Sequence, residues 1–163
     1  PGADGFKILG AISDADILLG RAISAAGDMN GDGFSDIIIG SPKSSPQGAA
    51  YIVFGSSFRS ADVNVTITSD LVTKIYGGPT DRIGYSVRYA GDVDGDGTSD
   101  VVIGAPFETV HDNKISAGTV YVVYGRQGVS PEDFTDFDLR GGEFTSGLYG
   151  FTVDGANTLD MTG

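Results

Sequence analysis

The chain has 163 residues and a formal net charge of −12, from 10 Lys and Arg against 22 Asp and Glu. So acidic a chain lacks the clustered cations that neutralise phosphates, and it has no apolar run near the roughly 20 residues of a membrane-spanning helix. It also has no cysteine, which excludes disulfides and thiolate metal sites. We therefore expect a globular protein with no nucleic-acid partner and no membrane insertion.

In chain order, the first half predicts four short strands bounded by Gly, Pro, Asp and Ser. They cover residues 22–26, 36–39, 49–54 and 63–67. The run Ile37-Ile38-Ile39 in the second of them has no polar residue, so both faces of that strand should be covered. No segment keeps a helical apolar period over 11 residues.

The second half repeats the first. Asp92 begins a stretch that matches the one from Asp28, 64 residues earlier, and the predicted strands are 86–90, 100–103, 119–124 and 134–139. The second copy carries six extra residues near 107–116, a polar stretch that includes His111 and is expected to be a surface loop. A third copy begins at 150–155, which resembles 5–10.

This periodicity predicts an all-β fold. Repeated four-stranded antiparallel sheets, each covered on both faces by its neighbours, are the blades of a β-propeller. The predicted organisation is one propeller segment of about two blades plus a truncated third repeat, with boundaries near 5–68, 69–140 and 141–163. A β-sandwich is the alternative, but it does not predict near-identical copies.

Each complete copy contains an acidic loop with oxygen side chains at positions 1, 3, 5 and 9. Oxygen ligands without nearby imidazole or thiolate suit a hard cation, and calcium fits better than magnesium, which prefers a small octahedral shell with several waters. The candidate ligands are the side chains of Asp28, Asn30, Asp32 and Asp36 with the carbonyl of Phe34, and those of Asp92, Asp94, Asp96 and Asp100 with the carbonyl of Thr98. Two Ca²⁺ sites are predicted.

Two other interpretations explain these loops less well. An EF-hand needs a Glu at position 12 between two helices, but Ile39 and Ile103 stand there, in predicted strands. Solvated Asp-Gly turns explain most isolated Asp-Gly pairs, but not four oxygen side chains in the same places twice.

The whole pattern resembles the FG-GAP repeat of integrin α-subunit β-propellers and their bacterial relatives. The resemblance is carried by Leu19-Gly20 and Ile83-Gly84 before the loops, and by Gly40-Ser41-Pro42 and Gly104-Ala105-Pro106 after them. It implies one blade per repeat, with the calcium loop joining its first two strands and the ligands named above. Ser41 in place of Ala is a mild departure from the family pattern.

The resemblance implies a calcium-binding module for adhesion or for binding a protein or glycan, outside the cell or at its surface. An accessory propeller of a secreted phospholipase or other hydrolase, or a lectin-like carbohydrate binder, is the alternative. The residues do not suggest an enzyme: the chain has one His, no Cys and no Gly-x-Ser-x-Gly elbow. The acidic pairs Glu132-Asp133 and Asp136 with Asp138 are expected to form a solvated strand edge.

Two further expectations concern the surface. Two blades leave an apolar face bare at each end, so we expect further blades of the same chain, or identical chains, to complete the propeller. Asn64-Val65-Thr66 matches the N-glycosylation acceptor, but it falls in a predicted strand and carries little weight.

Overall fold

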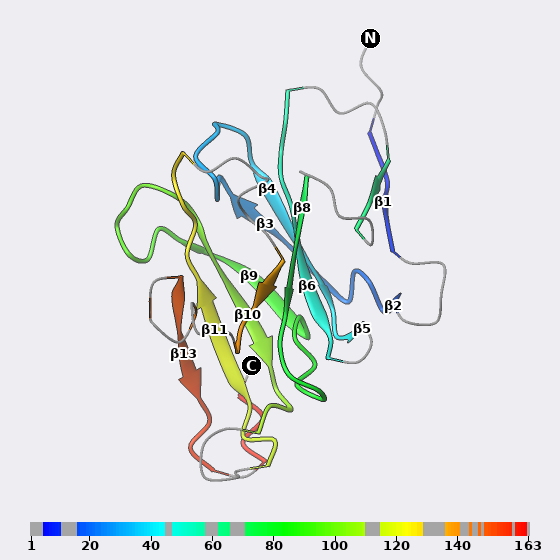
Figure 1. The fold of residues 1–163 in the computed structure, drawn as a ribbon, viewed down its shortest axis with the longest axis vertical. Helices are drawn as coiled ribbons and strands as arrows, with labels where there is room; N and C mark the ends of the chain where they lie inside the picture. The colour runs from blue at the N-terminus through cyan, green and yellow to red at the C-terminus, as the bar shows by residue number, and fades with distance from the viewer. Residues whose placement is uncertain are drawn as a thin grey trace.

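The structure is a computed structural model that describes residues 5–10, 16–44, 47–57, 62–65, 71–109, 115–128, 136–140, 144, 147, 149–157 and 159–162. Two antiparallel sheets lie beside each other and contain most of the described strands (Figure 1). The chain is therefore all-β, built from blades of a β-propeller as the sequence predicts. In the described residues, no helix is long and apolar enough to cross a membrane.

The first sheet has the order β12-β8-β6-β4-β3. Its four long strands run antiparallel to their neighbours, while the two-residue β12 pairs with β8 in parallel. The strands are β3 (Ala22–Gly27), β4 (Asp36–Ser41), β6 (Ala49–Val53), β8 (Val72–Tyr76) and β12 (Phe137–Asp138).

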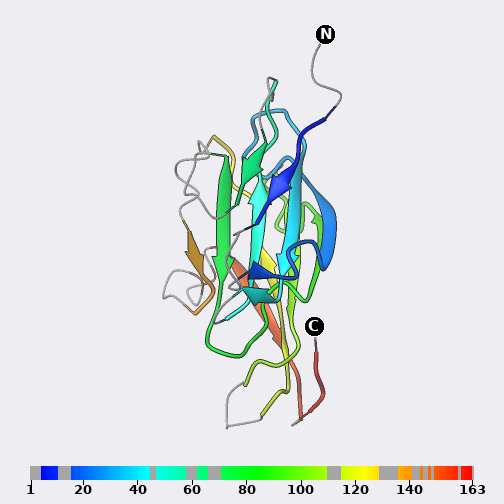
Figure 2. The same ribbon diagram turned by 90° about the vertical axis from the view of Figure 1, so that its right-hand side faces the viewer.

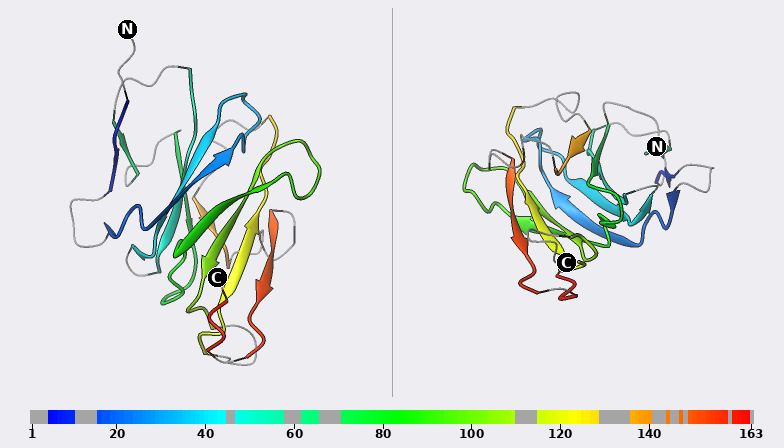
Figure 3. Two further views of the ribbon diagram at one scale, coloured as in Figure 1. Left: turned by 180° about the vertical axis from the view of Figure 1, so that it is seen from behind. Right: turned by 60° about the horizontal axis from the view of Figure 1, so that its bottom comes forward.

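The second sheet has the order β13-β11-β10-β9, antiparallel throughout. Its strands are β9 (Ser86–Gly91), β10 (Asp100–Ala105), β11 (Thr119–Val123) and β13 (Gly150–Asp154). Seen from behind, β3 and β9 run side by side (Figure 3), and the amide of Tyr89 donates a hydrogen bond to Ser24 Oγ, 3.1 Å away. The two edge strands thus join the sheets.

The first three strands of each copy are confirmed to within one or two residues, but the fourth is wrong in both. Residues 63–65 do not close the first sheet, because β7 (Val63–Asn64) pairs in parallel with β1 (Ile8–Leu9) in a small separate sheet near the N-terminus (Figure 2). The fourth strand of the first sheet, beside β6, is β8 instead. Residues 66 and 67 lie outside the described part of the chain.

In the second copy, the described residues 136–139 contribute β12, which pairs with β8 of the first sheet. The fourth position beside β11 is taken by β13, which forms five register pairs with it. A short apolar run predicts a strand but not its partner, because pairing depends on neighbours far along the chain. Residues 134 and 135 are not described, and the boundaries 5–68, 69–140 and 141–163 stay a prediction.

Two apolar clusters cover the first sheet. The larger lies between the two sheets and includes Ile38, Ile75 and Ile103. The smaller lies on the other face and includes Ile39, Tyr51 and the β7 residue Val63. Neighbouring residues of β4 therefore enter different clusters, which explains the unbroken isoleucine run. A second two-residue pair, β2 (Asp16–Ile17) with β5 (Lys43–Ser44), lies beyond the end of β4.

Candidate metal centres in two acidic loops

Two equivalent loops lead into the second strand of each sheet. The first acidic loop, residues 28–36, joins β3 to β4, and the second acidic loop, residues 92–100, joins β9 to β10. Both project from the same end of the two neighbouring sheets (Figure 1). Each begins after a glycine with positive φ, Gly27 at 69° and Gly91 at 86°, where the strand pairing shifts register. The glycines allow the chain to leave the sheet sharply.

The first carboxylate of each loop holds the turn together. Asp28 accepts hydrogen bonds from the backbone amides of Asp32 (3.0 Å) and Gly33 (2.9 Å). Asp92 accepts the equivalent bonds from Asp96 (3.1 Å) and Gly97 (3.0 Å). Each loop therefore wraps around the carboxylate at position 1.

The last carboxylate of each loop ties the loop to the sheet. Asp36 accepts hydrogen bonds from the amides of Met29 and Gly55, both 2.8 Å away. In the second loop, Asp100 accepts them from Val93 (2.6 Å) and Gly125 (2.9 Å). Asp36 thus links the start of the first loop to the residues that follow β6, and Asp100 links the start of the second loop to the residues that follow β11.

Both of these carboxylates are buried, and burial changes their acidity. Burial raises the pKa of Asp36 to about 6, although the two backbone amides lower it and the charges of Asp32 and Asp28 add to the increase. Burial likewise raises the pKa of Asp100, with Asp94 and Asp92 adding to it. The negative charge at position 9 is therefore costly unless a cation lies nearby.

The second loop brings three carboxylates together. One oxygen each of Asp92, Asp94 and Asp100 lie within 4.8 Å of one another, close enough to hold a metal ion. All three donors are oxygens, the ligand type that a hard divalent cation takes. The residue types therefore fit the predicted metal. Asp96 is exposed and receives hydrogen bonds from the amide and the hydroxyl of Thr98, which is itself buried.

The first loop is similar but carries one charge fewer. Asn30 is buried, and its amide nitrogen donates a hydrogen bond to Asp32 Oδ2 at 3.0 Å. The amide of Phe34 donates to the other oxygen of Asp32, and the Phe34 side chain is 40% exposed. Asn30 thus places a neutral amide where the second loop has Asp94. Among the described residues, the structure does not bring Asp28, Asp32 and Asp36 as close to one another as Asp92, Asp94 and Asp100.

The structure also contains a polar cluster that the sequence analysis missed. Asp81 is buried and forms an ion pair with Arg140 at 2.8 Å. Glu108, also buried, lies 3.7 Å from the same guanidinium and accepts a 2.6 Å hydrogen bond from the hydroxyl of Tyr121. Burial is the main cause that raises the pKa of both carboxyls. These residues come from separate segments and share no motif, so no sequence signal could have grouped them.

Of the other residues considered from the sequence, Glu132, Asp133 and His111 lie outside the described residues. Asp136 precedes β12 and accepts a hydrogen bond from the amide of Lys74, while Asp138 is the last residue of β12 and accepts one from the amide of Arg140. Both residues are exposed, as expected for a solvated strand edge.

Comparison with known proteins agrees with this architecture. The FG-GAP repeat model matches residues 19–53 and 84–123, which contain both acidic loops. Integrin alpha-4 of Xenopus laevis is 33% identical over 150 residues, covering 88% of this chain and 13% of that protein. Integrin alpha-3 of Cricetulus griseus is 27% identical over 149 residues, covering 86% and 13%. Integrin alpha pat-2 of Caenorhabditis briggsae is 37% identical over 89 residues, covering 53% and 7%.

These matches confirm the resemblance to FG-GAP repeats and to integrin α subunits. The chain spans no more than 13% of the length of these three relatives.

Proposed function

Because this chain is a β-propeller segment of the FG-GAP repeat family, we propose that it is a calcium-stabilised module that binds a protein or glycan partner in adhesion, outside the cell or at its surface. The relatives are integrin α subunits, which supports the adhesive role. The observation that carries the calcium part of the proposal is the convergence of Asp92, Asp94 and Asp100.

Each acidic loop would hold one Ca²⁺. In the second loop the ligands would be Asp92, Asp94, Asp96 and Asp100 with the carbonyl of Thr98. In the first they would be Asp28, Asn30, Asp32 and Asp36 with the carbonyl of Phe34. Calcium accepts six to eight oxygens in flexible geometry, which such loops supply more readily than the strict octahedron of magnesium.

Bound calcium would stabilise the folded protein and would take no part in a chemical reaction. The second loop collects four carboxylates within nine residues, and Asp100 is buried. A bound divalent cation offsets their mutual repulsion and the burial cost of Asp100. The two acidic loops would then be rigid, and other loops at the rims of the blades would contact the partner. We assign no catalytic role to the chain.

Thermal unfolding tests the proposal. A ligand that binds only the folded state stabilises it by RT ln(1 + [L]/Kd), about 2.7 kcal/mol at a hundredfold excess over Kd. We expect the melting temperature of the metal-free protein to rise with added CaCl₂ and to fall back with chelator, with a smaller rise in MgCl₂. An unchanged melting temperature in calcium would refute the calcium part of the proposal.

A further inference from the structure

Four side chains form a row at the end of the sheets opposite the acidic loops. Arg21 and Tyr85 directly precede β3 and β9, and Phe107 follows β10. The guanidinium carbon of Arg21 lies 4.8 Å from the ring centre of Tyr85, and that ring centre lies 6.3 Å from the one of Phe107. The guanidinium carbon of Arg82 lies 4.4 Å from the Phe107 ring centre. We call these four residues the stacked row.

The backbone holds Arg82 in an unusual conformation. Its φ is 56°, in the left-handed region that residues with a side chain rarely adopt. Asp81 before it is buried and ion-paired with Arg140. Ile83 after it is fully buried, and the amide of Ile83 donates a hydrogen bond to the Gln47 carbonyl at 3.3 Å. The two fixed neighbours therefore keep Arg82 in place, with its side chain exposed.

The two arginines of the stacked row have aromatic rings as partners. In the part of the chain that the structure describes, every ion pair involves Arg140, which contacts the buried carboxylates of Asp81 and Glu108. The acidic residues next to the row are thus turned towards Arg140, while Arg21 and Arg82 are exposed. In a chain with 22 acidic and 10 basic residues, the row is a local excess of positive charge.

The stacked row is not part of the packing that the two repeats share. The residue 64 positions before Tyr85 is Arg21, itself a member of the row, and the residue 64 positions before Phe107 is Lys43. The first repeat therefore has no aromatic ring at either place. Because both repeats build the same kind of sheet without it, the row is better explained by contact with a partner than by folding.

A guanidinium that lies over an aromatic ring still presents its N–H donors along its edge. These donors lie in one plane and match the two oxygens of a carboxylate. The ring restricts the guanidinium before binding, so less side-chain entropy is lost when a ligand binds. Two such groups, joined by two rings, fit a ligand with two carboxylates spaced along it.

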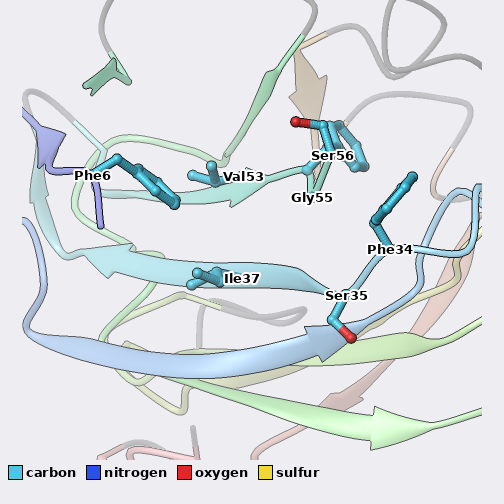
Figure 4. A pocket seen from close by; sticks show the side chains of 8 residues that line it. Phe6, Phe34, Ser35, Ile37, Val53, Gly55 and Ser56 are labelled. Atoms are coloured by element: carbon cyan, nitrogen blue, oxygen red, sulfur yellow. The ribbon is translucent and has the colours of Figure 1, made fainter. Parts of the chain in front are cut away.

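The open pocket beside the first acidic loop offers no such chemistry. Its volume is about 220 Å³, and the lining residues that the structure describes carry no charge. Figure 4 shows Phe34, Ile37 and Val53 among the side chains around it. A charged partner is therefore recognised better by the stacked row than by this pocket.

We infer that the stacked row binds an acidic segment of a protein partner, with one carboxylate on Arg21 and another on Arg82. The inference rests on the proposed function, because it says which residues at the rims of the blades contact the partner. A long sulfated glycan fits less well, since the net charge of −12 repels an extended polyanion. A short acidic segment forms close ion pairs at the row, and the more distant acidic residues are screened beyond about 8 Å at physiological ionic strength.

Fluorescence anisotropy of a labelled peptide tests the inference on the full chain. The probe is a decapeptide of alternating Glu and Gly in CaCl₂ and about 0.15 M NaCl, and the control peptide has Gln in place of Glu. We expect the Glu peptide to bind at least about tenfold more tightly than the Gln peptide. Equal affinities, or no binding of the Glu peptide, would overturn the inference.

Arg82→Gln and Arg88→Gln are a matched pair of variants. Each removes one exposed arginine, but Arg88 lies in β9, outside the stacked row. We expect Arg82→Gln to weaken binding of the Glu peptide about tenfold and Arg88→Gln to weaken it less than about twofold. Arg82→Lys should also weaken it, because an ammonium lacks the planar fork. Equal losses in Arg82→Gln and Arg88→Gln would mean that only net charge matters, which would overturn the inference.

Two further measurements separate this inference from the proposed function and from a glycan partner. Arg82→Gln should keep the calcium-dependent rise in melting temperature, because Arg82 lies at the opposite end of the strands from the acidic loops. A calcium response without peptide binding would overturn only the inference, and peptide binding without a calcium response would overturn only the calcium part of the proposed function. A sulfated oligosaccharide that binds more tightly than the Glu peptide, and loses affinity in Arg82→Gln, would overturn the choice of a protein partner.

Discussion

Gly40 and Gly84 meet backbone to backbone across the two sheets. A Cβ added to Gly40 would overlap the carbonyl oxygen of Gly84, and one added to Gly84 would overlap the carbonyl oxygen of Ala49. Gly40 also accepts a 3.0 Å hydrogen bond from the amide of Gly20. The glycine near the end of the second strand of one repeat therefore packs on the glycine before the first strand of the next. This contact gives a physical reason for the two glycines at the ends of the motif.

The first prediction concerns Gly40→Ala. The new methyl group would push against backbone rather than against a flexible side chain, so we expect a loss of stability of at least about 1–3 kcal/mol. Gly5→Ala is the control, because nothing lies within 4 Å of the added Cβ. Urea unfolding in CaCl₂ measures both. A Gly40→Ala variant as stable as Gly5→Ala would show that the two sheets do not pack as described.

The second prediction ranks the two acidic loops. Asp94 offers a charge where Asn30 offers a neutral amide, and an extra charge a few ångströms from a cation is worth on the order of 1 kcal/mol or more. We expect the second loop to bind calcium more tightly by roughly tenfold. Calorimetry on Asp94→Asn should show the tighter site weakened, and Asn30→Asp should strengthen the weaker one. Equal affinities in the parent chain would contradict the ranking.

The third prediction separates the two roles of the loop carboxylates. In chelator, Asp100→Ala leaves the amides of Val93 and Gly125 without their partner, and an unpaired buried donor costs about 1–3 kcal/mol. Asp94→Ala removes an exposed carboxylate that accepts a hydrogen bond from the amide of the exposed Asp96, and it should change the metal-free stability by less than about 0.5 kcal/mol. In calcium, both variants should lose stabilisation. Equal stability of the two variants in chelator would show that the hydrogen bonds accepted by Asp100 do not stabilise the metal-free sheet.

The fourth prediction concerns pH. Burial raises the pKa of Glu108 above its ordinary 4.5, so the folded protein holds a proton that the unfolded chain has already released. The contribution of Glu108 to the free energy of unfolding is therefore fully present below pH 4.5. It is lost as the pH rises through the raised pKa of Glu108 in the folded protein. Glu108→Gln should flatten this part of the pH dependence.

The matched control for Glu108 is an exposed carboxylate, Asp62→Asn. Asp62 accepts a hydrogen bond from the amide of Lys7 at the surface, and its removal should leave that slope unchanged. Guanidinium unfolding between pH 4 and 8 measures the free energy of unfolding of both variants and of the parent chain. The same slope in Glu108→Gln and the parent chain would contradict the role assigned to Glu108.

The sequence predicts the parts of this molecule that are local. Asp92, Asp94 and Asp100 lie within nine residues, so their convergence follows from one turn and its glycines. The inner strands follow from apolar runs that pair with their immediate neighbours. The outer positions could not be predicted, because β8 and β13 reach their places only through pairing with β6 and β11. The ion pair of Asp81 with Arg140 joins residues 59 apart that carry no motif.

Counting bound calcium tests the central proposal most directly. Equilibrium dialysis of the metal-free chain against CaCl₂, followed by metal analysis, should find two Ca²⁺ per chain. The double variant Asp92→Ala with Asp94→Ala should bind one, and the further pair Asp28→Ala with Asp32→Ala should abolish binding. A parent chain that binds no calcium, or variants that bind as much as the parent, would contradict it.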